Sequence, residues 1–212
     1  MASCPAPDFR FEDDAHDAGH GVVCGLDEAG CGPWAGPVVA AVVILDRARL
    51  PKGINDSKKL PPARRFALFD ELQASARCAV GIASAARIDR DNILAARLWA
   101  MAKALRTLTI APEFALVDGN RLPALPCPAR AIVAGDALSL SIAAASIVAK
   151  VTRDRLMETL EAEFPGYGFA AHKGYGTPEH AAALALLGPC REHRRSFAPI
   201  AALLTSGAFS GG

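Results

Sequence analysis

The sequence predicts an α/β fold in which a mixed central β-sheet is flanked by helices. Two apolar, β-rich runs come first, at residues 22–26 and 38–45, each bounded by glycine and proline. Further short apolar runs then alternate with segments of helical periodicity, which is the order expected for a sheet covered by helices. No internal repeat or interdomain linker interrupts the chain, so we expect a single domain over residues 19–205.

The first half of the chain is expected to contain a tail, three strands and two helices. Residues 1–18 carry prolines and acidic residues without periodicity, which predicts a mobile tail. Prolines at the start of residues 61–74, followed by apolar residues at helical spacing, predict one helix, and residues 89–108 predict a longer one. The strands are expected over residues 22–26, 38–45 and 78–83.

The second half alternates strands, helices and one long loop. Residues 114–117 and 131–134 are short apolar runs that end next to Asp-Gly or Gly-Asp, so we expect two strands. Residues 138–164 predict a long, initially alanine-rich helix, and a glycine-aromatic loop over 165–177 follows. The remaining expected segments are a helix over 178–187, a basic stretch over 191–196, a short helix over 198–204 and a frayed tail over 206–212.

Composition bounds the kind of protein and its surroundings. The chain has 212 residues, of which 51% are hydrophobic, and a formal net charge of only +1, so a nucleic-acid partner would need a local basic face. Its six cysteines form no C-x-x-C motif, which favours reduced thiols in a cytoplasmic protein over a zinc ribbon. The N-terminus is acidic and no apolar run is long enough to span a bilayer, so we expect no membrane association.

Four carboxylates share one sequence context, the end of an apolar strand beside a glycine. Asp27 and Glu28 follow the first strand, while Asp118 and Asp136 stand at or just past the ends of the two later ones. If these strands are neighbours, the four side chains converge at one edge of the sheet. Carboxylates about 4 Å apart repel by roughly 4 kcal/mol per pair at an effective dielectric constant near 20, and Mg²⁺ or Mn²⁺ would reverse that sign.

Each carboxylate also has an ordinary structural explanation. Asp27 and Glu28 fit a solvated acidic turn, Asp118 fits the Asp-Gly-Asn of a hairpin loop, and Asp136 fits a helix N-cap. Neighbouring residues on a strand point to opposite faces, so we expect the turn to begin at Glu28 or Ala29 if both acids serve one site. The shared context favours a site for two divalent ions that hydrolyses a phosphodiester.

Several segments in addition match a known family, and they occur in its order over about residues 22–200. The chain closely resembles bacterial ribonuclease HII, the type 2 ribonuclease H. The matching segments are DEAGCGPWAGP (27–37), DSKKL (56–60), VDGN (117–120), GD (135–136), IAAASIVAKVTRD (142–154), YGFAAHKGYGT (167–177) and HRRSFAP (193–199).

The resemblance implies a ribonuclease H-like fold and a metal-dependent endonuclease. Such an enzyme cuts the RNA strand of RNA–DNA hybrids and incises 5′ of single ribonucleotides embedded in duplex DNA, leaving 3′-hydroxyl and 5′-phosphate ends. By motif position, the catalytic carboxylates that bind two Mg²⁺ or Mn²⁺ ions are expected to be Asp27, Glu28, Asp118 and Asp136.

The resemblance also implies how the ribose is recognised. Gly30, Cys31 and Gly32 resemble the backbone element that contacts the 2′-hydroxyl, and Tyr175 resembles the aromatic residue that packs on the sugar beside the cleaved junction. The 2′-hydroxyl is the group that distinguishes RNA from DNA. The alternative for Tyr175 is a loop aromatic that only packs.

Two positions depart from the usual family pattern. Cys31 stands where the family usually has arginine between two glycines, and Ala134 stands where it usually has lysine before Gly-Asp. Both changes remove positive charge near an anionic substrate, but no carboxylate is missing. We therefore expect the reaction class to be kept and substrate affinity to be weaker or compensated elsewhere.

Phosphate contacts are expected from basic residues in two groups. The alternative for each one is a solvated side chain on a helix edge or loop. The residues predicted to bind substrate in this way are Lys58, Lys59, Lys173, Arg194 and Arg195.

Two other classes of function stay open at this stage. A non-catalytic module would bind RNA–DNA hybrid or ribonucleotide-containing duplex without needing metal. A metal-dependent enzyme acting on a small phosphorylated molecule would have no affinity for duplex. The complete carboxylate set argues against the first, and the basic C-terminal group against the second. We expect a monomer.

Overall fold

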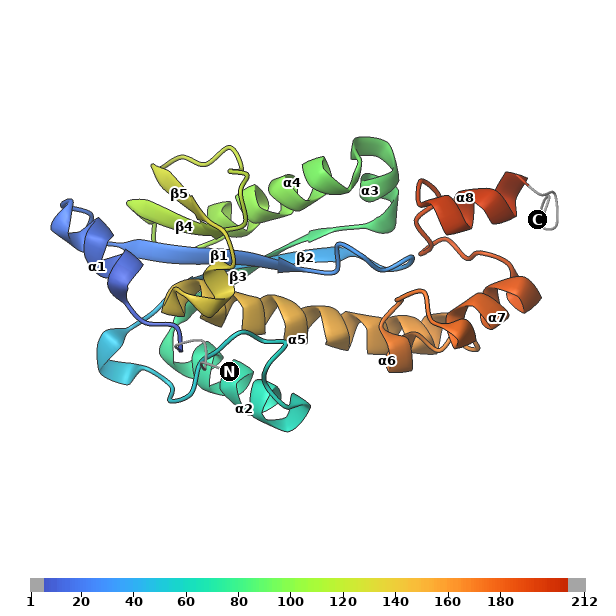
Figure 1. Ribbon diagram of the computed structural model, residues 1–212, viewed down its shortest axis with the longest axis horizontal. Helices are drawn as coiled ribbons and strands as arrows, with labels where there is room; N and C mark the ends of the chain where they lie inside the picture. The colour runs from blue at the N-terminus through green and yellow to red at the C-terminus, as the bar shows by residue number, and fades with distance from the viewer. Residues whose placement is uncertain (1–5, 206–212) are drawn as a thin grey trace, which may run out of the picture.

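The computed structural model describes residues 6–205 and shows a five-stranded mixed sheet between two layers of helices (Figure 1). The strand order is β3-β2-β1-β4-β5, with β1 in the centre. β1 pairs antiparallel with β2 and parallel with β4; the β2–β3 pair is antiparallel and the β4–β5 pair parallel. The strands are β1 Val23–Ala29, β2 Val38–Ile44, β3 Arg77–Ala83, β4 Phe114–Asp118 and β5 Ala129–Ile132.

The helices cover both faces of the sheet and extend beyond one end of it (Figure 1). α5 and α2 lie on one face and α4 on the other, while α6, α7 and α8 gather near the C-terminal end of α5. The helices are α1 Arg10–Asp17, α2 Pro62–Ser75, α3 Ala85–Asp91, α4 Ile93–Arg106, α5 Leu140–Glu163, α6 Phe169–His172, α7 Pro178–Leu187 and α8 Ala198–Thr205, with short 3₁₀ turns η1 Arg47–Arg49 and η2 Gly135–Ala137.

The mixed sheet flanked by helices confirms the predicted fold class, and the order of the central elements agrees with the expectation. The predicted helix over 89–108 is instead two helices, because Asn92 has a positive φ of 66° and its side chain caps α4 by accepting from the Ala95 N–H. Within residues 6–205, no helix combines the length and apolar composition needed to cross a bilayer.

Glycine and alanine allow α5 to lie unusually close to the central strand. A Cβ atom added at Gly25 would lie 2.1 Å from the carbonyl carbon of Ser141 at the start of α5. The next turn of the helix contains the fully buried residues 143–145, all alanine, which belong to the apolar cluster on this side of the sheet. Small side chains at both surfaces therefore set the distance between α5 and β1, and with it the position of everything that α5 carries.

The expected mobile tail is wrong for residues 10–17, which form α1. This helix packs against β1 and β4 through an apolar cluster that includes Ala15, Val23 and Leu116. Its Glu12 is 3% exposed, and one carboxylate oxygen accepts from the Ser139 hydroxyl at 2.7 Å and from the Ser141 N–H at 2.9 Å. The structured body therefore begins before residue 19; residues 1–5 and 206–212 lie outside the described residues.

Glu12→Ala should lower the free energy of unfolding by about 2 kcal/mol, because it leaves the buried donors of Ser139 and Ser141 without their acceptor. Urea unfolding followed by circular dichroism would measure the change. Asp17→Ala, which alters an exposed acid on the same helix, is the control and should stay within about 0.5 kcal/mol of wild type. Equal stability of the two variants would contradict the anchoring role of Glu12.

Candidate active site

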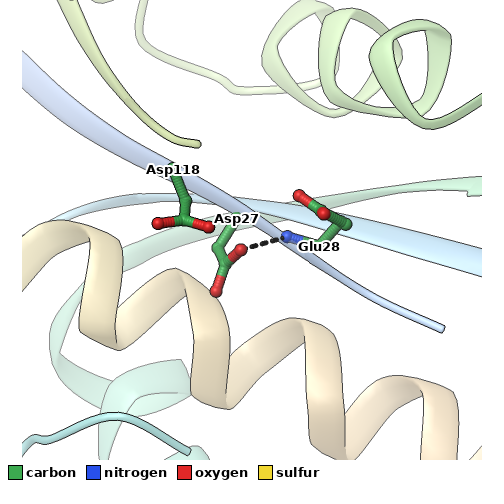
Figure 2. Close-up of side chains that lie close together, drawn as sticks. All are labelled: Asp27, Glu28 and Asp118. Carbon is green, nitrogen blue, oxygen red and sulfur yellow. Dashed lines mark hydrogen bonds between the residues drawn. The ribbon is translucent and has the colours of Figure 1, made fainter. Parts of the chain in front are cut away.

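Three carboxylates meet where β1 and β4 end, next to α5 (Figure 2). β1 and β4 are adjacent and parallel, with Leu26 opposite Val117, so the next residues, Asp27 and Asp118, lie side by side. Glu28 follows on β1, and Asp27, Glu28 and Asp118 each offer one oxygen within 4.8 Å of the other two. The sequence-based prediction that these three side chains converge is therefore met by the geometry.

Asp27 is the most buried of the three, with 4% of its surface exposed. Its Oδ1 accepts a hydrogen bond from the Glu28 N–H at 2.7 Å, and the side chain of Ser146 on α5 also interacts with the Asp27 carboxylate. Burial raises the pKa of Asp27 well above its usual value, and the nearby charges of Glu28 and Asp118 raise it further. An anion in this position needs a cation to offset its desolvation.

Glu28 leaves the strand on the opposite face, as alternation along a strand requires. β1 continues through Ala29, so the expectation of a turn beginning at Glu28 or Ala29 is wrong. Its Oε1 accepts from the guanidinium of Arg97 on α4 at 3.0 Å and from the thiol of Cys31 at 3.6 Å. Burial raises the pKa of Glu28, and the charge of Arg97 opposes that rise.

Arg97 was not foreseen from the sequence, although a signal for it exists. It lies four residues after Ile93 and four before Met101, on the line of α4 that faces the sheet. A charged residue on the apolar line of an amphipathic helix needs a partner, and Glu28 on the facing strand provides one.

Asp136 lies beside this group and not within it. It follows β5 on η2, where Ala134 adopts a positive φ of 55°, and it is 7% exposed. Its carboxylate pairs with Nζ of Lys58 at 3.2 Å. Burial and the neighbouring Asp136 raise the pKa of Asp118, whose Oδ1 accepts from the Gly135 N–H at 2.7 Å.

The donor set suits a divalent cation. All of the convergent ligands are hard carboxylate oxygens, which Mg²⁺ and Mn²⁺ prefer. Glu28 Oε2 is buried without a hydrogen-bond partner among the described residues, so one ligand position is available without breaking an existing bond. The residues that could hold such an ion are Asp27, Glu28 and Asp118, with Asp136 adjacent through Asp118.

A cavity of about 270 Å³ opens beside Glu28 and is bounded by the Gly30–Gly32 turn, Lys58 and Tyr175. Tyr175 is 47% exposed, and its Cε1 would lie 3.8 Å from a Cβ added at Gly32, so the ring stands over the turn. Gly30 has a φ of 97°, and a Cβ there would meet Arg153 Nε at 2.1 Å. The predicted ribose-binding residues are thus brought together next to the carboxylates.

Arg194 does not face the cavity, contrary to the prediction that it binds substrate. It is fully buried, and its guanidinium donates to the backbone carbonyls of Gly30 at 2.6 Å, Cys31 at 3.0 Å and Gly36 at 3.0 Å. Arg153, which sequence reasoning passed over, likewise donates to the carbonyl of Pro37 at 3.0 Å. Arg194 therefore holds the glycine turn from behind, and Arg153 holds the segment that follows the turn.

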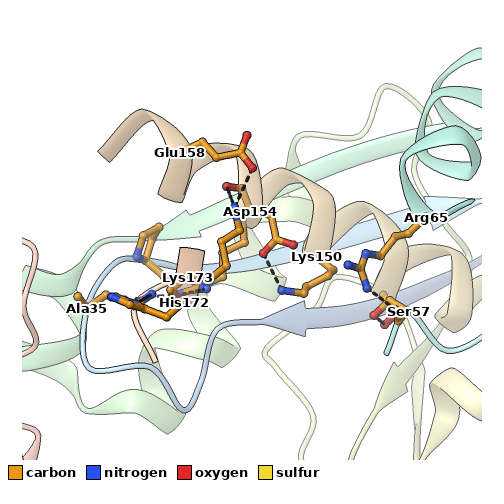
Figure 3. A network of polar contacts seen from close by, with 12 residues as sticks. Ala35, Ser57, Arg65, Lys150, Asp154, Glu158, His172 and Lys173 are labelled. Atoms are coloured by element: carbon orange, nitrogen blue, oxygen red, sulfur yellow. Dashed lines mark hydrogen bonds and ion pairs between the residues drawn. The ribbon is translucent and has the colours of Figure 1, made fainter. Parts of the chain in front are cut away.

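The other predicted basic residues have different surroundings, and Figure 3 shows those of Lys173. Lys173 pairs with Glu158 at 2.7 Å, and the cavity-lining Lys150 pairs with Asp154 at 2.6 Å. Lys58 remains 78% exposed at its side chain despite its contact with Asp136. Lys59 and Arg195 are exposed on the surface.

The position of Lys58 depends on its loop. Arg65 donates to the carbonyl of Ser57 at 2.6 Å (Figure 3), and the Ser57 hydroxyl bonds to Ser146 at 2.8 Å. Because Ser146 also interacts with Asp27, the DSKKL loop is linked to the carboxylate group through Ser146.

Comparison with known proteins agrees with this arrangement. The sequence model described as ribonuclease HII matches residues 24–200. The chain belongs to the ribonuclease HII family. It is 58% identical to the ribonuclease HII of Parvibaculum lavamentivorans over 202 residues, covering 95% of this chain and 75% of that protein.

Solved structures show the same relationship. The ribonuclease H2 of Pyrococcus horikoshii OT3 superposes with a TM-score of 0.72 at 27% identity, covering 87% of this chain and 98% of that one. Ribonuclease HII of Archaeoglobus fulgidus, from its complex with PCNA, gives 0.69 at 30% identity over 83% and 95% of the two chains. The protein is thus a metal-dependent endoribonuclease that degrades RNA in RNA–DNA hybrids.

Asp27→Asn should make the metal-free protein more stable at neutral pH. The folded state raises the pKa of Asp27, so it binds the proton more tightly than the unfolded state, and stability falls as pH rises and Asp27 ionises. The neutral amide removes that penalty. A gain of about 1 kcal/mol would raise the melting temperature by roughly 2–4 °C in EDTA.

Differential scanning fluorimetry at pH 7.5, with EDTA and then with Mg²⁺ or Mn²⁺, would measure this effect. Metal should stabilise the wild type much more than Asp27→Asn. Asp17→Asn, an exposed change on α1, is the control and should behave like wild type. If Asp27→Asn melts below wild type in EDTA, or if metal raises its melting temperature as much as that of wild type, the prediction is contradicted: Asp27 would then not be a destabilising carboxylate that binds the metal.

Proposed function

We propose that this enzyme, besides degrading RNA in RNA–DNA hybrids, incises 5′ of a single ribonucleotide embedded in duplex DNA, and that it leaves 3′-hydroxyl and 5′-phosphate ends. The observation that carries the proposal is the convergence of Asp27, Glu28 and Asp118 within 4.8 Å beside the cavity under Tyr175. The cellular consequence is removal of misincorporated ribonucleotides and of RNA–DNA hybrids.

In this proposal two Mg²⁺ or Mn²⁺ ions are held by Asp27, Glu28, Asp118 and Asp136. When bound, such ions activate the attacking water and stabilise the leaving oxygen. The role of the four side chains is to supply hard anionic ligands from fixed backbone positions. Ser146 orients Asp27, and Lys58 supplies a positive charge beside Asp136 where a phosphate would approach.

The Gly30–Gly32 turn and Tyr175 supply the selection for ribose. Gly32 is exposed and has no side chain, so a sugar can approach its backbone closely. The Tyr175 ring stands over the same turn and offers a face on which a sugar can pack. The 2′-hydroxyl can then hydrogen-bond to main-chain groups, which a deoxyribose cannot do.

Lys58, Lys59, Lys173 and Arg195 are proposed to contact the phosphate backbone, with Lys173 exchanging its Glu158 partner for a phosphate. We further propose that the enzyme acts as a monomer, since one chain supplies all of the side chains named. A cytoplasmic location is supported by the five described cysteines, Cys24, Cys31, Cys78, Cys127 and Cys190, which are all free thiols.

A gel assay with a labelled duplex that contains one ribonucleotide, beside an RNA–DNA hybrid and an all-DNA duplex, tests the proposal. We expect cleavage of the first two substrates with Mg²⁺ or Mn²⁺, none with EDTA, and none of all-DNA. Asp136→Asn should reduce cleavage roughly 100-fold or more by removing a fixed charge, while duplex binding persists. Asp70→Asn, an exposed acid on α2, is the matched control and should cleave normally.

Other outcomes would contradict separate parts of the proposal. Full activity of Asp136→Asn would remove Asp136 from the site. Duplex binding without cleavage by the folded wild type, in either metal, would favour a hybrid-binding module. Cleavage of the hybrid alone would retain the hydrolase and exclude incision at single ribonucleotides.

A further inference from the structure

Two buried histidines bond to each other behind the ribose-recognition residues. His180 on α7 and His193 in the following loop are 0% and 1% exposed, and their Nε2 atoms lie 3.0 Å apart. Two ring nitrogens at that distance share one proton, so one imidazole donates and the other accepts. The pair is therefore in a defined tautomeric state.

The surrounding backbone determines the direction of this hydrogen bond. The Cys190 N–H donates to Nδ1 of His193 at 3.0 Å, so the proton of His193 is on Nε2 and points at His180. His180 accepts it on Nε2 and carries its own proton on Nδ1, which donates to the carbonyl of Tyr175 at 2.9 Å. One chain of hydrogen bonds thus runs from Cys190 to Tyr175.

The environment keeps both rings neutral. Burial lowers the pKa of His193 to about 4 and lowers that of His180 as well. The ring of His172 stacks on His180 at 4.4 Å between centroids, and the Cys190 thiol lies 3.2 Å from His193 Nδ1. A second proton on Nε2 of His180 would face the Nε2–H of His193, and a second proton on Nδ1 of His193 would face the Cys190 N–H, so either one would break a hydrogen bond of this chain.

The pair connects the two sides of the proposed ribose site. At one end it holds the carbonyl of Tyr175, whose ring stands over Gly32. At the other end, His193 forms a β-bridge with Ala35 and is followed directly by Arg194, which binds the carbonyls of Gly30 and Cys31. Tyr175 and the Gly30–Gly32 turn belong to distant parts of the chain. The His180–His193 hydrogen bond connects the residues that hold each of them in place.

We propose that His180 and His193 form a positioning pair that fixes Tyr175 against the Gly30–Gly32 turn and so sets the preference for a single ribonucleotide in DNA. The inference rests on the proposed function of Tyr175. Neither histidine faces the cavity, so the pair acts through the backbone of Tyr175 and through Arg194. A single ribonucleotide offers one 2′-hydroxyl for recognition, so its cleavage depends on this alignment more than that of a continuous hybrid does.

The tautomers are tested without substrate, by ¹⁵N NMR of the imidazole rings in the full chain. We expect His180 to carry its proton on Nδ1 and His193 to carry its proton on Nε2, both neutral at pH 7. A proton on Nε2 of His180, or a cationic ring in either residue, would overturn the positioning pair whatever the enzyme cleaves.

Two substitutions at His180 separate positioning from packing. In His180→Gln the side-chain amide can still donate to Tyr175 and accept from His193, so the ratio of single-ribonucleotide to hybrid cleavage should stay within about 3-fold of wild type. His180→Leu loses both bonds and should lower that ratio by roughly 10- to 100-fold, the scale expected for a misplaced recognition group. Tyr167→Phe is the control, since it deletes a buried bond to the Gly188 carbonyl in the same cluster.

Tyr167→Phe should lower the melting temperature and leave the ratio unchanged. The proposal would be overturned if His180→Leu cleaved both substrates more slowly by the same factor. It would also be overturned if a folded His180→Gln showed a ratio of single-ribonucleotide to hybrid cleavage far below that of wild type. If His180→Leu fails to fold, the cleavage ratio of His180→Gln and the tautomers measured by NMR test the positioning pair instead. A wild type that does not incise single ribonucleotides would instead overturn the proposed function, and the NMR result separates the two failures.

Discussion

The close packing of α5 on the central strand is the contact on which the site depends. Gly25 and the alanines at 143–145 let the helix approach β1 within backbone contact. α5 then carries Ser146 to Asp27, Arg153 to the rear of the glycine turn, and its own N-terminus to Glu12 of α1. A larger residue at Gly25 would move all of these groups together, because one rigid helix holds them.

The second constraint is the burial of like charges. Asp27, Glu28 and Asp118 gain no stability from their convergence, since burial and repulsion from neighbouring carboxylates raise the pKa of each. Arg97 offsets this only in part, from the face opposite Asp27. Such a group persists because the strands and α5 impose its geometry. A divalent ion bound there would offset the desolvation and repulsion of the carboxylates.

Two arginines show that the tertiary structure decides which element supplies a charge. Cys31 and Arg97 contact the same oxygen of Glu28, and the guanidinium there is supplied by α4 and not by the glycine turn. Arg194 shows the opposite case, in which a residue predicted to bind phosphate instead supports the backbone. Both results concern which element supplies a charge, and neither changes the carboxylate ligands.

The sequence by itself determined the fold class, the order of the central elements and the convergence of Asp27, Glu28 and Asp118, because apolar periodicity and strand-end acids are local patterns. It failed where a long-range contact decides the outcome. α1 is helical and anchored because Glu12 finds buried donors near Asp136, more than 120 residues along the chain, and nothing in an acidic segment signals such a partner. The tertiary structure alone decided that Arg97 would face Glu28, that Arg194 would be buried, and that His180 would hold Tyr175, because burial and pairing depend on which distant elements pack together.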